Sequence, residues 1–202
     1  ARLVILDNAS PFALHRQRAL RLIEGEHVTI LPGVPFMFGH LANTRDAFDL
    51  GRVRVCYSAA AALTPDIASA FAARFRVPIR NHYGCTEVGV MTIDLDADPG
   101  AHGPTVGRAF PGVRVRILDD AGAELPTGAV GEVVVSSRAM TSGYRGAGED
   151  GSALFRGGSY HTGDLGALDA TGRLTLHGRM KFVIDVVGHQ VSPIEIEDGL
   201  AS

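Results

Sequence analysis

The stretch TPDIASAFAARFRVPIRNHYGCTE, residues 64–87, decides the fold class. Thr64 and Pro65 predict a helix start, because a threonine side chain caps the first turn and proline suits the first helical position. The helix continues through DIASAFAARF, and VPIRN, at 77–81, predicts the strand that follows. Ligands of open α/β sheets bind beyond the carboxyl ends of the strands. We therefore expect functional side chains in NHYGCTE, residues 81–87.

The same alternation of strand and helix extends back to the first residues. Short apolar or alternating runs predict further strands at residues 1–7, 27–31 and 52–58. Helices are expected over residues 10–25 and 34–41. Such short alternating units favour a parallel sheet with helices on its faces. SAAAAL, residues 58–63, then lies at the carboxyl end of a second strand.

From about residue 104 the pattern changes to an all-β one. Short strands in GVRVRIL, AVGEVVVSS and GRLTLHG are separated by the turns DDAG, PTG and DATG, and AGEDGSALFRGGS is expected to be a surface loop. The segment 181–197 predicts a β-hairpin that turns near residues 187–189, then a helix from Ser192. We expect part of an α/β subdomain over 1–103, a small β-barrel-like subdomain over 104–178, and a hinge with the start of an α+β domain over 179–202.

Composition excludes several classes of protein. The 202 residues are 46% hydrophobic with a net charge of -3, so the chain is globular and has no basic footprint for nucleic acid. No apolar run approaches the roughly 18 residues of a membrane span, and no signal peptide is evident. The two cysteines form no disulfide framework, which favours a reducing, cytoplasmic location.

NHYGCTE combines residue types that suit a nucleotide. Tyr83 offers a flat ring for stacking, and Gly84 permits a close approach of the backbone. Thr86 supplies a hydroxyl for a phosphate oxygen, and Glu87 a carboxylate of the kind that binds Mg²⁺ together with phosphates. A strand end capped by polar residues would give the same pattern.

A cysteine hydrolase is the alternative interpretation of the same stretch. Cys85 lies three residues after His82 and two before Glu87, and Cys, His and Glu can form a nucleophilic triad. Substitution of Cys85 separates this alternative from the nucleotide site.

Two later motifs carry charged residues of the same kind. Asp164, in YHTGDLG, follows a glycine turn, and a carboxylate can accept both hydroxyls of a ribose. Arg179 and Lys181, in HGRMK, stand at the junction with the predicted hairpin. Each motif alone is also typical of a turn aspartate or of solvated surface charges.

In their order and spacing, these motifs resemble the adenylate-forming superfamily of acyl- and aryl-CoA ligases, luciferase and peptide-synthetase adenylation domains. YGCTE matches Y-G-x-T-E, and SAAAAL stands where relatives often carry S-G-G-A-P-L. HVTILPGVPFMFGHL, PTVGRAFPGVRVRILDDAGAELPTGAVGEVVV, TSGY, YHTGD and GRMKFVIDVVGHQVSPIEIE follow the family order. The resemblance covers nearly the whole chain.

The resemblance implies ATP-dependent activation of a small carboxylic acid, with Mg²⁺, followed by transfer to CoA or to a phosphopantetheinyl carrier protein. Adenine would lie between Tyr83 and the backbone at Ala60 and Ala61. Thr86 would contact phosphate, Glu87 would hold Mg²⁺, and Asp164 and Arg179 would bind the ribose. Lys181 would be the hinge of a small C-terminal domain, and Gly188 would lie near the pantetheine path.

Two departures from the family pattern concern the substrate side. Ala59 and Ala60 replace a common Gly-Gly pair, and their methyl groups would narrow the wall between adenine and acyl group. His82 replaces a common glycine, and we predict that it makes the acyl pocket shorter or more polar; a solvent-facing His82 is the alternative. Further candidate pocket residues are Phe36, Val88, Gly89, Val90 and Met91.

Features outside the ends of this chain are also expected. The family's phosphate-binding loop and its C-terminal lysine are absent from the sequence, so we expect a piece of a longer protein that turns over little by itself. TEVGVM, Lys181 and VSPIEIE favour a CoA ligase over a peptide-synthetase domain. A carrier-protein ligase, and a non-catalytic or split nucleotide-binding half, remain the alternatives. The oligomeric state is not predicted.

Overall fold

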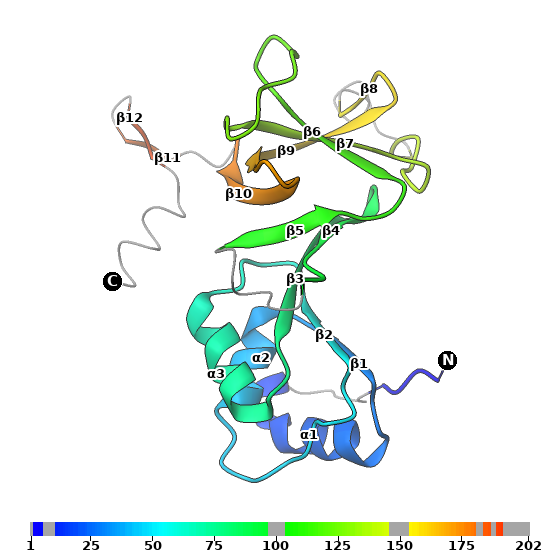
Figure 1. Ribbon diagram of the computed structural model, residues 1–202, viewed down its shortest axis with the longest axis vertical. Helices are drawn as coiled ribbons and strands as arrows, with labels where there is room; N and C mark the ends of the chain where they lie inside the picture. The colour runs from blue at the N-terminus through cyan, green and yellow to red at the C-terminus, as the bar shows by residue number, and fades with distance from the viewer. Residues whose placement is uncertain are drawn as a thin grey trace. The chain divides into compact units, whose positions relative to one another are not determined.

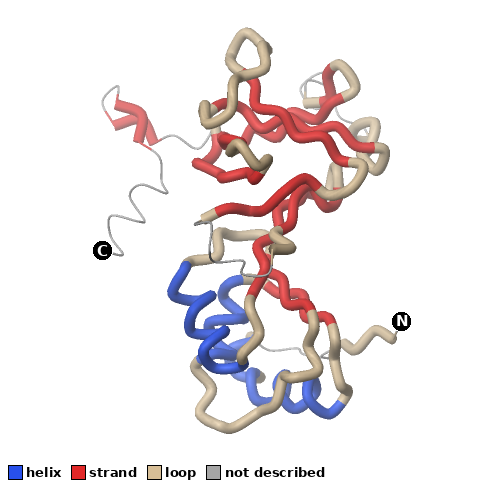
Figure 2. The backbone as a smooth tube through the Cα atoms, viewed as in Figure 1, coloured by secondary structure: helices blue, strands red, loops and turns tan. Residues whose placement is uncertain are grey.

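The structure is a computed structural model that describes residues 2–5, 11–96, 104–145, 154–180, 184–186 and 189–191. The chain forms two compact units (Figure 1). The first comprises Ala1–Tyr83 and Ile93–Pro104, and the second comprises Gly84–Thr92 and Thr105–Ser202. Among the described residues, all helices lie in the first unit (Figure 2).

The first unit is a three-stranded parallel sheet with helices, as the sequence predicts. Its elements are η1 (Phe12–Leu14), α1 (Arg16–Gly25), β1 (Ile30–Gly33), α2 (Pro35–Ala42), β2 (Val55–Ser58), α3 (Pro65–Phe75) and the start of β3 (Ile79–Cys85). β2 pairs in parallel with β1 and with β3, and Ser58 stands opposite Asn81. Phe38 and Phe71 are almost fully buried and join α2 to α3 with ring centroids 5.2 Å apart.

The ends of α3 follow from local sequence. Thr64 Oγ1 accepts a hydrogen bond from the Ile67 N–H at 3.4 Å, and Pro65 occupies the first turn. Arg76 closes the helix in the left-handed conformation, with φ of 57°. The predicted helix start at Thr64–Pro65 is therefore confirmed.

The N-terminal segment departs from the prediction. A buried strand is expected at residues 1–7, but the described residues 2–5 have no regular secondary structure. Leu3 is 81% exposed and Ile5 is 72% exposed. No described strand pairs with this segment, and an apolar run becomes a strand only where a neighbouring strand satisfies its backbone groups. The prediction is wrong for these residues.

The second unit is built from strands, as the change of pattern near residue 104 predicts. They are β4 (Gly89–Ile93), β5 (Thr105–Ala109), β6 (Val113–Leu118), β7 (Gly131–Ser137), β8 (Phe155–Arg156), β9 (Ser159–Leu168) and β10 (Arg173–Arg179). Their order is β4-β5-β10-β9-β7-β6, with β8 beside β9. β7 is covered on both faces, since the consecutive residues Val133, Val134 and Val135 are all fully buried.

The predicted C-terminal hairpin is confirmed in its strands. β11 (Ile184–Val186) pairs antiparallel with β12 (His189–Val191). The turn residues, and the helix predicted from Ser192, lie outside the described residues. β8 falls within AGEDGSALFRGGS, so the part of this predicted loop at Phe155–Arg156 is a short strand instead.

The compact units differ in one place from the predicted subdomain 1–103. Gly84–Thr92 belongs to the second unit, because its backbone and side chains bond there. Phe110 N–H donates to Met91 O at 2.9 Å, and Thr92 Oγ1 donates to Val106 O at 2.7 Å. The predicted boundary near residue 178 stays a prediction.

Ala60 has a backbone conformation that disfavours alanine. Its φ is 70°, in the left-handed region, which costs an L-residue with a Cβ about 1–2 kcal/mol. A glycine at this position would relieve that strain. The greater conformational freedom of glycine in the unfolded chain would offset about 0.4–1 kcal/mol of the stability gained. We expect Ala60→Gly to raise the free energy of unfolding by about 0.5 kcal/mol, measured by urea denaturation.

Ala61→Gly is the matched control. Ala61 is not among the residues with positive φ, so glycine only adds freedom to the unfolded chain and should lower the free energy of unfolding by about 0.5–1 kcal/mol. Equal destabilisation by both substitutions would contradict the assignment of strain to Ala60.

Candidate functional site

In the first unit, the predicted adenine wall lies at the carboxyl end of β2. Ser58 ends the strand and is buried, and the Ala59 N–H donates to Gly33 O at 3.1 Å. Ala60 and Ala61 follow immediately and are exposed. The location that the sequence predicts for SAAAAL, at a strand end, is therefore confirmed, while its role stays a prediction.

His82 and Tyr83 lie on β3 and are both half-buried. The His82 ring lies 5.5 Å from the ring of Tyr57, centroid to centroid. Its Nδ1 is buried and has no hydrogen-bond partner within the described part of the chain. Burial lowers the pKa of His82, so a neutral imidazole is favoured at neutral pH.

In the second unit, the segment 141–144 contacts Glu87, and Cys85 and Tyr160 also form side-chain hydrogen bonds with it. Tyr144 Oη donates a hydrogen bond to Glu87 Oε1, and the Thr141 N–H donates to Glu87 O at 2.8 Å. The bond from Tyr144 is the main cause of a lowered pKa of Glu87. An ionised carboxylate therefore stands on the turn that follows β3, beside the exposed Thr86.

A single carboxylate of this kind can bind Mg²⁺ only together with other oxygen ligands. No group of three or more His, Cys, Asp or Glu side chains that could hold a metal is found among the described residues. Mg²⁺ commonly uses one or two carboxylates and takes its other oxygens from water and substrate phosphates. Glu87 is therefore suited to a metal that arrives with a phosphate ligand.

Asp164 and Arg179 are brought together across two strands. Arg179 Nε donates to Asp164 Oδ1 at 2.7 Å, and the two residues are register partners of β10 and β9. Asp164 is only 7% exposed. The sequence places it behind a glycine turn, and this is wrong: it lies inside β9, where Gly163, with φ of 69°, interrupts the regular pairing with β7.

Cys85 has the properties of a structural thiol. Burial, with a contribution from Glu87, raises the pKa of Cys85 to about 11. Burial raises the pKa of Cys56 to about 12. Only thiolates are strong nucleophiles, so the cysteine hydrolase is disfavoured.

This arrangement predicts slow alkylation. At pH 8 about one Cys85 thiol in a thousand is ionised, three pH units below the pKa of about 11. We expect iodoacetamide to modify native protein roughly 100-fold more slowly than free cysteine, with the rate rising about tenfold per pH unit up to pH 10. Cys85→Ser should keep nucleotide binding and activity. Loss of activity with intact nucleotide binding would revive the hydrolase.

The other predicted site residues differ in exposure. Val88 is 1% exposed and Met91 is fully buried, whereas Val90 is 37% exposed and Phe36 is 57% exposed. Gly89 is exposed with φ of 82°. Lys181 and Gly188 lie outside the described residues. Their predicted roles, and the acyl pocket, stay predictions.

The sequence motifs predict no role for Tyr144 or Tyr160. Tyr144 stands in TSGY, which indicates the family but carries no role by itself. Its contact with Glu87 spans 57 residues of sequence. No spacing rule predicts such a pair.

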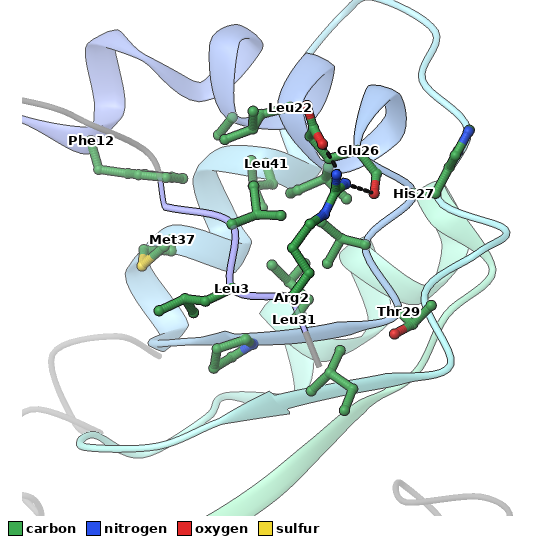
Figure 3. Close-up of a pocket in the computed structure, with 16 residues that line it drawn as sticks. Arg2, Leu3, Phe12, Leu22, Glu26, His27, Thr29, Leu31, Met37 and Leu41 are labelled. Atoms are coloured by element: carbon green, nitrogen blue, oxygen red, sulfur yellow. Dashed lines mark hydrogen bonds and ion pairs between the residues drawn. The ribbon is translucent and has the colours of Figure 1, made fainter.

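The first unit also contains an apolar cavity with a volume of about 460 Å³. The N-terminal segment, α1, β1 and α2 line it, and Arg2 reaches Glu26 across it (Figure 3). None of the predicted site residues lines this cavity. The cavity therefore does not coincide with the motif residues. None of the helices in the described ranges is long and apolar enough to cross a membrane.

Comparison with known proteins agrees with the motifs. Residues 1–145 match the AMP-binding enzyme family. The chain is 35% identical over 174 residues to sulfoacetate–CoA ligase of Cupriavidus necator, covering 85% of this chain and 34% of that protein. It is 39% identical over 124 residues to the fatty acid–[acyl-carrier-protein] ligase ScoC of Streptomyces coeruleorubidus, covering 58% and 24%.

A solved structure shares the fold. ATP-bound MatB from Rhodopseudomonas palustris superposes with a TM-score of 0.79 and 31% identity over 93% of this chain and 37% of that chain. The protein thus belongs to the AMP-binding enzyme family, within the adenylate-forming superfamily. The chain spans about a third of the length of the sulfoacetate ligase and of MatB.

Proposed function

We propose that the protein to which this chain belongs activates a carboxylic acid with ATP and transfers the acyl group to the thiol of CoA. A carboxylate oxygen bonds to the α-phosphorus, and the bond from that phosphorus to pyrophosphate breaks. The thiol then attacks the acyl carbon of the acyl-adenylate, and AMP leaves. Catalysis of such steps is largely positioning and charge neutralisation.

The observation that carries this proposal is the ionised Glu87 carboxylate, held on the Y-G-x-T-E turn by Tyr144. Glu87 would bind Mg²⁺, which would neutralise phosphate charge. Thr86 would contact a phosphate oxygen. Asp164 and Arg179 would bind the ribose hydroxyls, and their ion pair supports this role.

The remaining residues keep the roles that the family resemblance implies. Tyr83, Ala60 and Ala61 would contact adenine. Lys181 would act as the hinge, and Gly188 would lie beside the pantetheine arm. The predicted acyl pocket comprises His82, Val88, Gly89 and Val90, and His82→Gly should change the carboxylate preference if His82 lines it.

Pyrophosphate–ATP exchange by the full-length protein, measured across a panel of carboxylic acids, tests the proposed function. We expect exchange with one acid or a few related acids. Thioester formation with CoA, compared with a phosphopantetheinyl carrier protein, then separates the two possible acceptors. ScoC, as a carrier-protein ligase, supports the second acceptor as the alternative. Exchange with no acid would favour a non-catalytic nucleotide-binding protein.

A further inference from the structure

Two hydrogen bonds join the segment 141–144 to Glu87, one from the side chain of Tyr144 and one from the backbone of Thr141. Its hydroxyl donates to Glu87 Oε1. Three residues earlier, the Thr141 N–H donates to Glu87 O at 2.8 Å. Residues 141–144 thus fix both the main chain and the carboxylate of a residue that lies 57 positions earlier.

Aromatic packing limits the motion of Tyr144 itself. Its ring meets Phe155 edge-on, with centroids 5.6 Å apart and an interplanar angle of 73°. Phe155 in turn lies 5.1 Å from the ring of Tyr160, its partner across β8 and β9. Tyr160 is only 7% exposed, so this row of rings begins in the core of the second unit. The hydroxyl of Tyr144 is therefore presented from a supported ring, although 44% of the residue is exposed.

We propose that Tyr144 is a positioning residue that orients the Glu87 carboxylate for the Mg²⁺ of the nucleotide complex. This inference rests on the proposed function. Glutamate has several rotatable bonds, and an unsupported carboxylate on a turn would be distributed over many rotamers. A hydrogen bond to one carboxylate oxygen selects an orientation and leaves the group ionised. Hydrogen-bond partners of this kind change metal affinity by roughly 10- to 100-fold when they are removed.

Tyr144→Phe tests the inference, because it deletes the hydroxyl and keeps the ring against Phe155. The probe is Mn²⁺, titrated by electron paramagnetic resonance into full-length protein saturated with α,β-methylene-ATP. We expect the Mn²⁺ dissociation constant to rise about tenfold. The affinity for the metal-free analogue should change less than about twofold, because the hydroxyl donates to Glu87 and its proposed effect is on the metal. A general structural defect would weaken both.

Two further variants complete the design. Thr171→Val deletes a hydroxyl in the turn between β9 and β10, where Thr171 Oγ1 donates to Asp169 Oδ1 at 2.7 Å, and should keep the wild-type Mn²⁺ constant. Phe155→Leu keeps the Tyr144 hydroxyl but loosens its ring, and should raise the constant about threefold. This second variant carries the test if Tyr144→Phe does not fold.

The outcomes separate the two proposals. A wild-type Mn²⁺ constant in Tyr144→Phe, with wild-type protein that binds Mn²⁺ tightly, overturns the positioning role and leaves the proposed function intact. If wild-type protein holds Mn²⁺ no better than the free analogue does, the metal role of Glu87 fails, and the proposed function with it.

Discussion

Glu87→Gln is expected to lower pyrophosphate–ATP exchange by roughly 100- to 1,000-fold, which is the usual loss when one group that stabilises developing charge is removed. Glutamine has the shape of glutamate and still offers Tyr144 an acceptor oxygen, so the turn should keep its conformation. It lacks the negative charge that makes a carboxylate a strong ligand for Mg²⁺. Thermal unfolding should show a folded protein, and the loss should appear as a metal-binding defect.

The control for this prediction is Glu124→Gln. Glu124 also lies in the second unit, but its side chain is 55% exposed and meets Arg114 at 3.5 Å. Exposed pairs of this kind contribute little, so exchange should stay within twofold of wild type, roughly. If Glu87→Gln exchanged pyrophosphate at the wild-type rate, Glu87 would have no role in catalysis.

Asp164→Asn is expected to weaken ATP binding by about 10- to 100-fold, because hydrogen bonds to a charged group contribute about 1.5–3 kcal/mol. The variant should remain folded, since Arg179 is 59% exposed on its side chain and stays solvated when the ion pair is lost. Isothermal titration calorimetry with ATP and with 2′,3′-dideoxy-ATP measures the effect. Wild type should prefer ATP, and the variant should bind both nucleotides almost equally.

Asp120→Asn provides the comparison, because Asp120 is an exposed aspartate on the turn after β6. It should bind ATP as wild type does. If Asp164→Asn weakens ATP and the dideoxy analogue by the same factor, Asp164 acts through the fold and not through the ribose hydroxyls.

Much of the candidate site was predictable, because the side chains that define it stand in short motifs. The positions of Thr86 and Glu87 after a strand follow from the helix cap at Thr64 and the apolar strand that comes next, whereas Tyr83 lies within β3, which runs further than the sequence predicts. The ion pair of Asp164 with Arg179 was not derivable from spacing. It depends on the register between β9 and β10, in which Arg179 stands opposite Asp164.

The sequence by itself determined the α/β pattern, the change to strands near residue 104 and the family, since periodicity, caps and motifs are local along the chain. Only the tertiary structure decided that residues 2–5 are not a strand, that Asp164 lies within β9, and that Tyr144 donates a hydrogen bond to Glu87. Each of these depends on which distant segment lies alongside. Strand partners and side-chain contacts across 57 residues are set by packing of the whole unit, which no local pattern encodes.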